Sequence, residues 1–183
     1  MNKTWIKNSA IVISLILTVC LFPKSKIKAD VVASGDCGVT GDNLTWTFDD
    51  STGTLTISGE GNMANMEDVD NAPWNEYRSR INEIVVEENV ISIGDYAFWN
   101  CSNLTSVTLP EGVLSIGNSA FYTCTSLASI EIPESVSSIG TAAFSGCANL
   151  TSIEIPHNVN QIKNYTYGEG EFRPGIKKPA GPL

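Results

Sequence analysis

Three cysteines, Cys101, Cys124 and Cys147, recur at a constant spacing of 23 residues, and thiols are groups that can form disulfides or bind metals. If that spacing is one structural repeat, the thiols form a column about 4.8 Å apart, within the Cα separation that a disulfide accepts. One disulfide and one remaining thiol are therefore geometrically open. Small buried thiols that serve packing are the favoured interpretation. A metal site is disfavoured because tetrahedral ligands must converge, whereas these lie in a line.

Few other residues could support catalysis. His157 is the single histidine, and it follows a proline at the position where the preceding units carry Glu111 and Glu134. This position predicts a surface side chain. The sequence shows no pairing of cysteine or serine with histidine and no glycine-rich phosphate loop. We therefore expect a non-catalytic protein with no catalytic residues, no cofactor-binding residues and no metal ligands.

These residues belong to three ungapped copies of a 23-residue unit, beginning at Ile93, Ile116 and Ile139. The copies share Ile-Gly, Ala-Phe, Cys, Leu, an aliphatic pair and Pro in the same columns. A period of this length is typical of solenoids, so it predicts the fold class even without an assignment of secondary structure. Half a unit, residues 81–91, precedes the copies, and Ile162 opens a fourth that is not completed.

Each unit contains a short segment in which apolar and polar residues alternate, as in a half-buried strand. These segments are residues 107–109, 130–132 and 153–155, and each is followed by a proline that ends the hydrogen-bond ladder. The Ile-Gly pairs predict tight turns. Ala97, Phe98 and Cys101 have the spacing of a short helix or 3₁₀ turn that faces inward. Because one unit cannot bury its own apolar face, the units must stack, and we expect a β-rich α/β repeat solenoid.

An N-terminal cap is expected before the repeats. Residues 43–48 and 54–58 alternate around a turn-forming stretch, which predicts a β-hairpin over the first coil. Its apolar side chains would face the solenoid near Trp74. An aromatic sugar-binding platform of Trp46 and Trp74 is the alternative. The inward-facing residues of the hairpin are Trp46, Phe48, Leu55 and Ile57.

The chain begins with the features of a secretory signal peptide. Lys3 and Lys7 precede an apolar run over residues 10–22, and the small Ala29 precedes Asp30. The run is shorter than the roughly twenty residues that cross a bilayer. An uncleaved anchor and a lipoprotein signal at Cys20 are the alternatives. The predicted organisation is a signal peptide at 1–29, the cap at 30–80, the solenoid at 81–165 and a flexible, Gly- and Pro-containing tail at 166–183.

The charge of the chain after the leader is strongly acidic. Six Lys and Arg residues and all twenty Asp and Glu residues follow Ala29, which gives a net charge of −14. No Lys or Arg occurs between Ile93 and Ile162. Nucleic-acid backbones and anionic lipid surfaces both require clustered cations. The sequence therefore excludes nucleic acid as a partner, and we expect no membrane insertion once the leader is cleaved.

The repeat columns resemble the BspA-like leucine-rich repeats of bacterial surface proteins. The segment GDCGVTGDNLTWTFDDSTGTLTISGEGNM, followed by APW, is similar to the part that often precedes such repeats, so the resemblance covers residues 36–162. It implies an exported protein, secreted or associated with the cell surface. For several members it also implies adhesion to host matrix or to other cells. This chain is short and shows no recognisable wall-anchoring motif, which leaves its surface attachment open.

The outward columns of the predicted strands form the candidate binding face, since solenoids use such faces for partners. Trp99 and Tyr122 could add aromatic anchors beside the core. The expected partner is an extracellular or host protein, such as a matrix protein. The alternative is a structural spacer, or a truncated remnant of a longer surface protein, with no ligand of its own. The candidate residues are Ser106, Thr108, Ser129, Glu131, Ser152 and Glu154.

Overall fold

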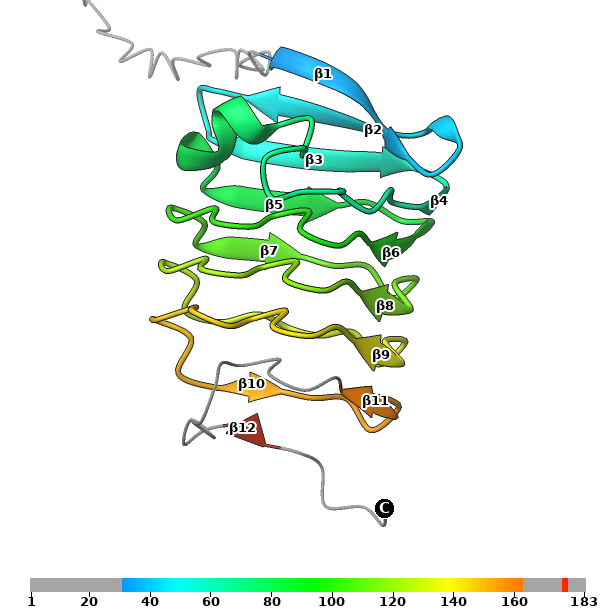
Figure 1. The fold of residues 1–183 in the computed structure, drawn as a ribbon, viewed down its shortest axis with the longest axis vertical. Coiled ribbons are helices and arrows are strands. Elements are labelled where there is room, and N and C mark those ends of the chain that lie inside the picture. The colour runs from blue at the N-terminus through cyan, green and yellow to red at the C-terminus, as the bar shows by residue number, and fades with distance from the viewer. Residues whose placement is uncertain (1–30, 163–175, 178–183) are drawn as a thin grey trace, which may run out of the picture.

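The computed structural model describes residues 31–162 and 176–177, and it shows a stack of coils along the long axis of the molecule (Figure 1). The strands that build the stack are short, and one 3₁₀ helix, η1, joins the cap to the first coil. The elements in chain order are β1 (Val31–Gly38), β2 (Gly41–Asp49), β3 (Thr54–Gly59), β4 (Gly61–Asn62), η1 (Asn75–Arg80), β5 (Glu83–Val86), β6 (Val90–Ile93), β7 (Ser106–Thr108), β8 (Ser115–Ile116), β9 (Ser138–Ile139), β10 (Ile153–Glu154), β11 (Gln161–Ile162) and β12 (Ile176–Lys177).

β10 pairs with β12 in a two-stranded sheet, and the coils otherwise build two five-stranded sheets on different sides of the stack (Figure 1). One sheet has the order β1-β2-β3-β5-β7, and the other has the order β11-β9-β8-β6-β4. Between coils the pairing is parallel and advances by one repeat, as in Ser92 with Ser115 and Ser115 with Ser138. The 23-residue sequence period is therefore the structural period, and the predicted β-rich repeat solenoid is confirmed.

A column of turns closes the third side of each coil, where the sequence predicts a short helix or 3₁₀ turn. Hydrogen bonds of the 3₁₀ type occur, as from Trp99 N to Tyr96 O at 3.1 Å, but they do not continue into a helix. Tyr96 and Asn100 have positive φ, and their amides donate to the next coil instead, with Asn100 N 2.7 Å from Tyr122 O. The predicted inward face of Ala97, Phe98 and Cys101 is confirmed, because all three are buried.

The glycines of the Ile-Gly pairs are required by close packing between coils. None of the three has a positive φ, so the backbone conformation does not demand glycine. A Cβ on Gly117 would lie 2.5 Å from the amide nitrogen of Asp95, and one on Gly140 would lie 2.5 Å from that of Asn118. The missing side chain thus lets each coil approach the preceding one at this corner.

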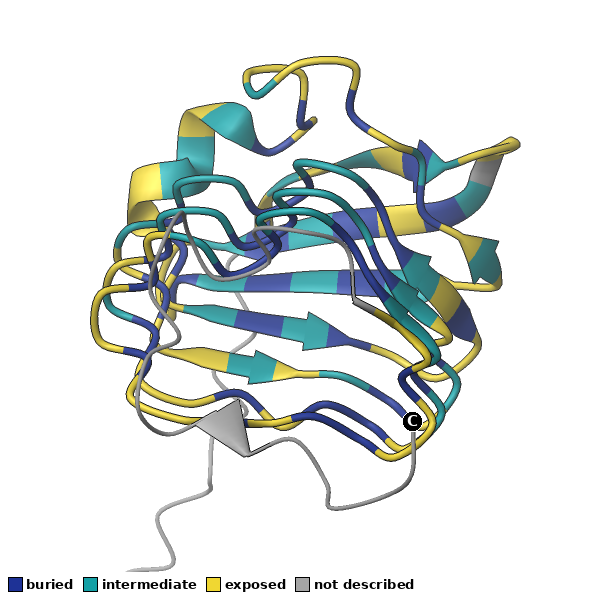
Figure 2. Cartoon of the chain, turned by 60° about the horizontal axis from the view of Figure 1, so that its bottom comes forward, coloured by how far each residue is buried: buried dark blue, intermediate teal, exposed yellow. Residues whose placement is uncertain are grey.

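Aromatic rings form a continuous column through the core. Phe98, Phe121 and Phe144 follow one another with ring centroids 5.3 and 5.5 Å apart. Trp74 stacks on Phe98 at 5.6 Å and ends the column beneath the cap. Its buried Nε1 donates to the carbonyl of Ala97 at 2.9 Å, so this large ring is buried without leaving its polar atom unpaired. Figure 2 shows buried residues recurring at the same places in successive coils.

The cap contains the predicted hairpin and two further strands, β1 and the short β4. β2 and β3 pair antiparallel, β1 pairs with the outer edge of β2, and β3 pairs in parallel with β5 of the first coil. The sheet of the cap therefore continues into the sheet of the solenoid. The side chains predicted to face inward are all buried, namely those of Trp46, Phe48, Leu55, Ile57 and Trp74.

The strand predicted over residues 130–132 does not form a hydrogen-bonded ladder. The alternation is still present, since Ile130 and Ile132 are buried and Glu131 is exposed. One repeat further along, Glu154 has the same place in its coil as Glu131. Because like charges opposite one another destabilise strand pairing, this repulsion gives a physical reason for the irregular segment.

Beyond the third full unit, β12 pairs in parallel with β10, Ile153 with Ile176 and Glu154 with Lys177. This strand covers an edge that would otherwise present unpaired backbone groups. The other residues of the predicted tail lie outside the described part of the chain, as does the signal peptide at 1–29. Within the described residues, no helix is both long and apolar enough to cross a membrane. The division of the chain into a signal peptide, a cap, a solenoid and a tail remains a prediction.

We expect Phe121→Ala to destabilise the fold by about 3–5 kcal/mol, because the lost ring leaves a cavity between two stacked neighbours. The measurement is the free energy of unfolding in urea. Leu114→Ala is the matched control, since Leu114 is 49% exposed and its truncation should change this free energy by less than about 0.5 kcal/mol. Equal losses in the two variants would contradict a continuous core column.

Candidate functional site: a polar strand face

The six residues predicted for the binding face are all exposed. β7 carries Ser106 and Thr108, and the ladder to β5 places them beside Glu83 and Val85. β10 carries Glu154, with Ser152 just before it. The remaining two, Ser129 and Glu131, lie in the irregular segment between these strands. The structure thus brings the six together as outward rows over three successive coils.

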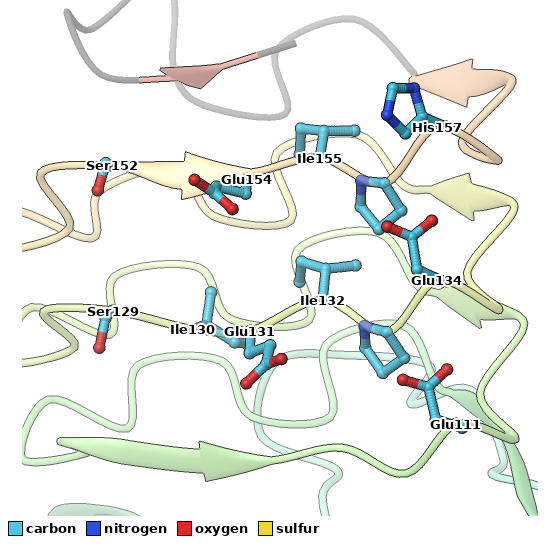
Figure 3. Close-up of a pocket in the computed structure, with 12 residues that line it drawn as sticks. Glu111, Ser129, Ile130, Glu131, Ile132, Glu134, Ser152, Glu154, Ile155 and His157 are labelled. Atoms are coloured by element: carbon cyan, nitrogen blue, oxygen red, sulfur yellow. The ribbon is translucent and has the colours of Figure 1, made fainter. Parts of the chain in front are cut away.

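The lower part of this face is hollowed (Figure 3). The hollow has a volume of about 610 Å³ and is lined by residues of three successive coils. Four of the predicted residues line it, whereas Ser106 and Thr108 do not, and Thr108 lines a separate hollow nearer the cap. The four are Ser129, Glu131, Ser152 and Glu154. The hollow includes the segment where the strand ladder is interrupted.

Sequence reasoning did not include the residues after the prolines in this face. Glu111, Glu134 and His157 occupy that position in successive units, and all three line the same hollow. Figure 3 shows them along one end of it, beyond the proline rings. The signal was present in the sequence, because the three residues lie one repeat apart. Only the tertiary structure shows that these three residues lie next to the exposed residues of the strand face.

The chemistry of the hollow is acidic and polar. The residues that line it include the four glutamates Glu111, Glu131, Glu134 and Glu154 and the imidazole of His157, and none of the described lining residues is Lys or Arg. The hollow also contains two hydroxyl groups and parts of Ile132 and Ile155. Such a surface can accept hydrogen bonds and attract cationic groups of a partner.

A second polar groove lies on the other sheet and was also absent from the sequence predictions. It has a volume of about 400 Å³, and the row of Ser92, Ser115 and Ser138 lies along it. Beside this row, the amide of Asn118 donates to Asp95 Oδ1 at 2.6 Å, and the amide of Thr141 donates to Asn118 Oδ1 at 2.9 Å. These side chains satisfy backbone groups of neighbouring coils, so their evident role is structural.

His157 is exposed at the rim of the hollow, as its place in the sequence predicts. Glu134 lies at the equivalent place one coil earlier, so the column contains one imidazole among carboxylates (Figure 3). In the part of the chain that the structure describes, no group of three or more His, Cys, Asp or Glu residues is arranged to hold a metal ion.

The cysteine column is a packing feature of the core. Cys101, Cys124 and Cys147 are buried thiols. The Sγ of Cys124 donates to the carbonyl of Phe98 at 3.2 Å, and that of Cys147 donates to the carbonyl of Phe121 at 3.1 Å. These hydrogen bonds join neighbouring coils. The favoured prediction of buried thiols that serve packing is confirmed.

Burial also suppresses the reactivity of the thiols. Desolvation raises the pKa of Cys101 to about 12. In the cap, desolvation and then the nearby Asp36 raise the pKa of Cys37 to about 12. The hydrogen bond with Cys147, followed by desolvation, raises the pKa of Cys124 well above its usual value. Since the thiolate is the nucleophile and the metal ligand, these cysteines are unsuited to either role.

The aromatic residues considered at the sequence level have two different environments. Trp46 and Trp74 are buried and meet edge to face, with centroids 5.9 Å apart, so they belong to the core and not to a sugar-binding platform. Trp99 and Tyr122 are half-buried and stack in parallel, with centroids 6.2 Å apart and an interplanar angle of 2°. The predicted partial exposure of this second pair is confirmed.

Two parallel sheets and a column of turns, repeated every 23 residues around an apolar core, define a leucine-rich-repeat solenoid. A family model described as "BspA type Leucine rich repeat region (6 copies)" matches residues 76–171, more than half of the chain. The chain belongs to this family of BspA-type leucine-rich-repeat proteins. No curated protein sequence matches it.

Solved structures of bacterial leucine-rich-repeat proteins are similar to the chain. One from Eubacterium ventriosum is 30% identical, with a TM-score of 0.57, over 72% of this chain and 40% of its own. One from T. pallidum is 23% identical, with a TM-score of 0.52, over 67% of this chain and 63% of its own. One from Bacteroides ovatus is 22% identical, with a TM-score of 0.42, over 75% of this chain and 52% of its own. The chain spans less than two thirds of the length of each.

We expect the four described cysteines to resist iodoacetamide at pH 8 in the native protein, because their thiols are buried. In guanidinium chloride all four should react, and mass spectrometry counts the modified residues. Rapid labelling of native Cys124 would contradict its burial.

The same pKa shifts predict a pH dependence of stability. An unfolded thiol ionises near 9, whereas the folded Cys101 keeps its proton to about 12, so the free energy of unfolding should fall as pH rises from 9 towards 12. Urea titrations at pH 8, 10 and 11 measure this slope. Cys101→Ala should make it shallower, and an unchanged slope would mean that Cys101 does not contribute.

Proposed function

We propose that the protein is an exported, non-catalytic binding module that acts at or near the bacterial cell surface and binds an extracellular protein through its polar strand face. The observation that carries the proposal is the arrangement of Ser129, Glu131, Ser152 and Glu154 around one hollow on exposed strand rows. Solenoids bind partners through such extended sheet faces. The family and the fold both agree with a binding role.

Export and surface association are supported by the leader and by the family. Residues 1–29 have the order of a signal peptide, and the resemblance to BspA-like proteins implies a place at the bacterial surface. Adhesion to host matrix is the form of binding that this resemblance suggests. The identity of the matrix component depends on a few exposed side chains, because the fold itself hosts many functions.

The strand face makes contact through hydrogen-bond acceptors and charge more than through apolar area. Thr108, Glu131 and Glu154 form the row expected to contact the partner, because they are exposed and alternate with buried or partly buried apolar residues. Charged groups on such a rim contribute chiefly to orientation and association rate. The face should therefore bind a partner with complementary positive charge, and raised salt should weaken the complex.

The experiment immobilises collagen, laminin and fibronectin separately and measures binding of residues 30–183 by surface plasmon resonance. Replacing Thr108→Ala, Glu131→Gln and Glu154→Gln together should weaken binding by at least tenfold, about 1.4 kcal/mol. The control is Glu67→Gln with Glu76→Gln, which makes the same change of net charge at exposed residues that line neither hollow of this face.

Equal binding by the triple variant and the wild type would place the site elsewhere on the molecule. Equal weakening in the triple variant and the charge control would mean that net charge, and not the strand face, determines binding. Absence of binding to all three matrix proteins would contradict the matrix-adhesion form of the proposal and favour a structural spacer.

A further inference from the structure

A mixed stack of a guanidinium and two aromatic rings lies outside the strand face. Arg78, from η1, places its guanidinium carbon 5.0 Å from the centre of the Trp99 ring. Its Nη2 also donates to the carbonyl of Val69 at 2.6 Å and lies 3.3 Å from Asp70, so the arginine is held in place. Tyr122, one coil further along the stack, lies almost parallel to Trp99 with the ring centroids 6.2 Å apart. The order of the stack is Arg78, Trp99, Tyr122.

The stack ends at Tyr122 because the next repeat carries a serine. The amide of Asn100 donates to Tyr122 O at 2.7 Å, and the amide of Thr123 donates to Ser145 O at 2.8 Å. Ser145 therefore has the same place relative to Tyr122 that Tyr122 has relative to Trp99. A serine is too small to cover an aromatic ring. Among the described residues, no further ring or guanidinium stacks on the second face of Tyr122.

The charge of the protein decides which kind of group would occupy this open face. The chain carries no Lys or Arg from residue 81 to residue 162, and its net charge after the leader is −14. A cation of a partner is therefore attracted to this region and meets no repulsion from these coils. At the other end of the stack, Arg78 shows that a guanidinium fits these rings. Arg stacks on aromatic faces better than Lys because its charged group is planar and weakly hydrated.

We propose that the open face of Tyr122 is a second binding site, which takes an arginine side chain of a basic protein or peptide partner. The bound guanidinium lies over the ring beside Ser145 and mirrors Arg78 on Trp99. The site is independent of the strand face, because none of its residues lines the hollow described above. A partner that reaches both surfaces gains avidity from the second contact without any change in the first.

The test uses residues 30–183 and two acetylated probe peptides, one with three arginines separated by glycines and one with lysines in their place. Isothermal titration calorimetry at 0.15 M salt measures both affinities. The wild type should prefer the arginine peptide. Tyr122→Leu should weaken arginine-peptide binding by about threefold to thirtyfold, the range expected for one cation–π contact. Tyr122→Phe keeps the ring face and should remain within twofold of the wild type.

A second pair of variants tests the same site without removing the tyrosine. Ser145→Tyr extends the stack, fills the open face and should weaken arginine-peptide binding as Tyr122→Leu does. Ser145→Ala leaves the face open and should bind like the wild type. Circular dichroism melting confirms that each variant is folded. If Tyr122→Leu does not fold, the Ser145 pair decides the result.

Equal binding by the wild type and the Ser145→Tyr variant would overturn the proposal, as would equal affinity for the arginine and lysine peptides. Maltohexaose and a tryptophan-containing neutral peptide are titrated in parallel, because a sugar ring or an aromatic side chain could use the same face. Tighter binding of either one, lost in Ser145→Tyr, would assign the face to that class of ligand and overturn the arginine proposal.

Discussion

The distance between successive coils is the constraint on which the rest of the structure depends. Phe98, Phe121 and Phe144 stack with centroids 5.3 and 5.5 Å apart, while backbone hydrogen bonds join the same coils at the ladder of Ser92, Ser115 and Ser138 and along the column of turns. Both interactions require every unit to have the same length. A residue inserted in one unit would break the register of the rings and of the ladders together, so the constant 23-residue spacing has a direct physical cause.

The same constraint explains residues that could be mistaken for chemistry. The cysteines recur because each fills a buried place in its coil, and the thiols of Cys124 and Cys147 donate to carbonyl groups of the neighbouring coil. The glycines recur because a Cβ would meet the backbone of the preceding coil. Repetition inside the stack therefore indicates packing. Residues that could determine a ligand are found at exposed positions of the repeat. They are also found where a column changes its residue type, as at Ser145, which follows Trp99 and Tyr122 in the same column.

None of the acidic side chains whose burial the structure describes is buried, and at the surface their charge has both a structural and a functional consequence. Glu131 and Glu154 occupy equivalent places in neighbouring coils, and the chain near Glu131 does not form a regular ladder. The hollow lies across this interruption. Like charges that weaken strand pairing thus also create a surface suited to a cationic partner. This links the local irregularity to the proposed binding role.

The sequence by itself determined the repeat, the buried face, the hairpin of the cap and the outward direction of Ser106, Thr108, Glu131 and Glu154. Period and alternation are local properties, and they act in the same way in every coil. Only the tertiary structure decided that residues 130–132 lack a ladder, that β12 pairs with β10, and that the column of His157 borders the hollow. These outcomes depend on the charges, edges and bends of neighbouring coils, which a periodic pattern does not contain.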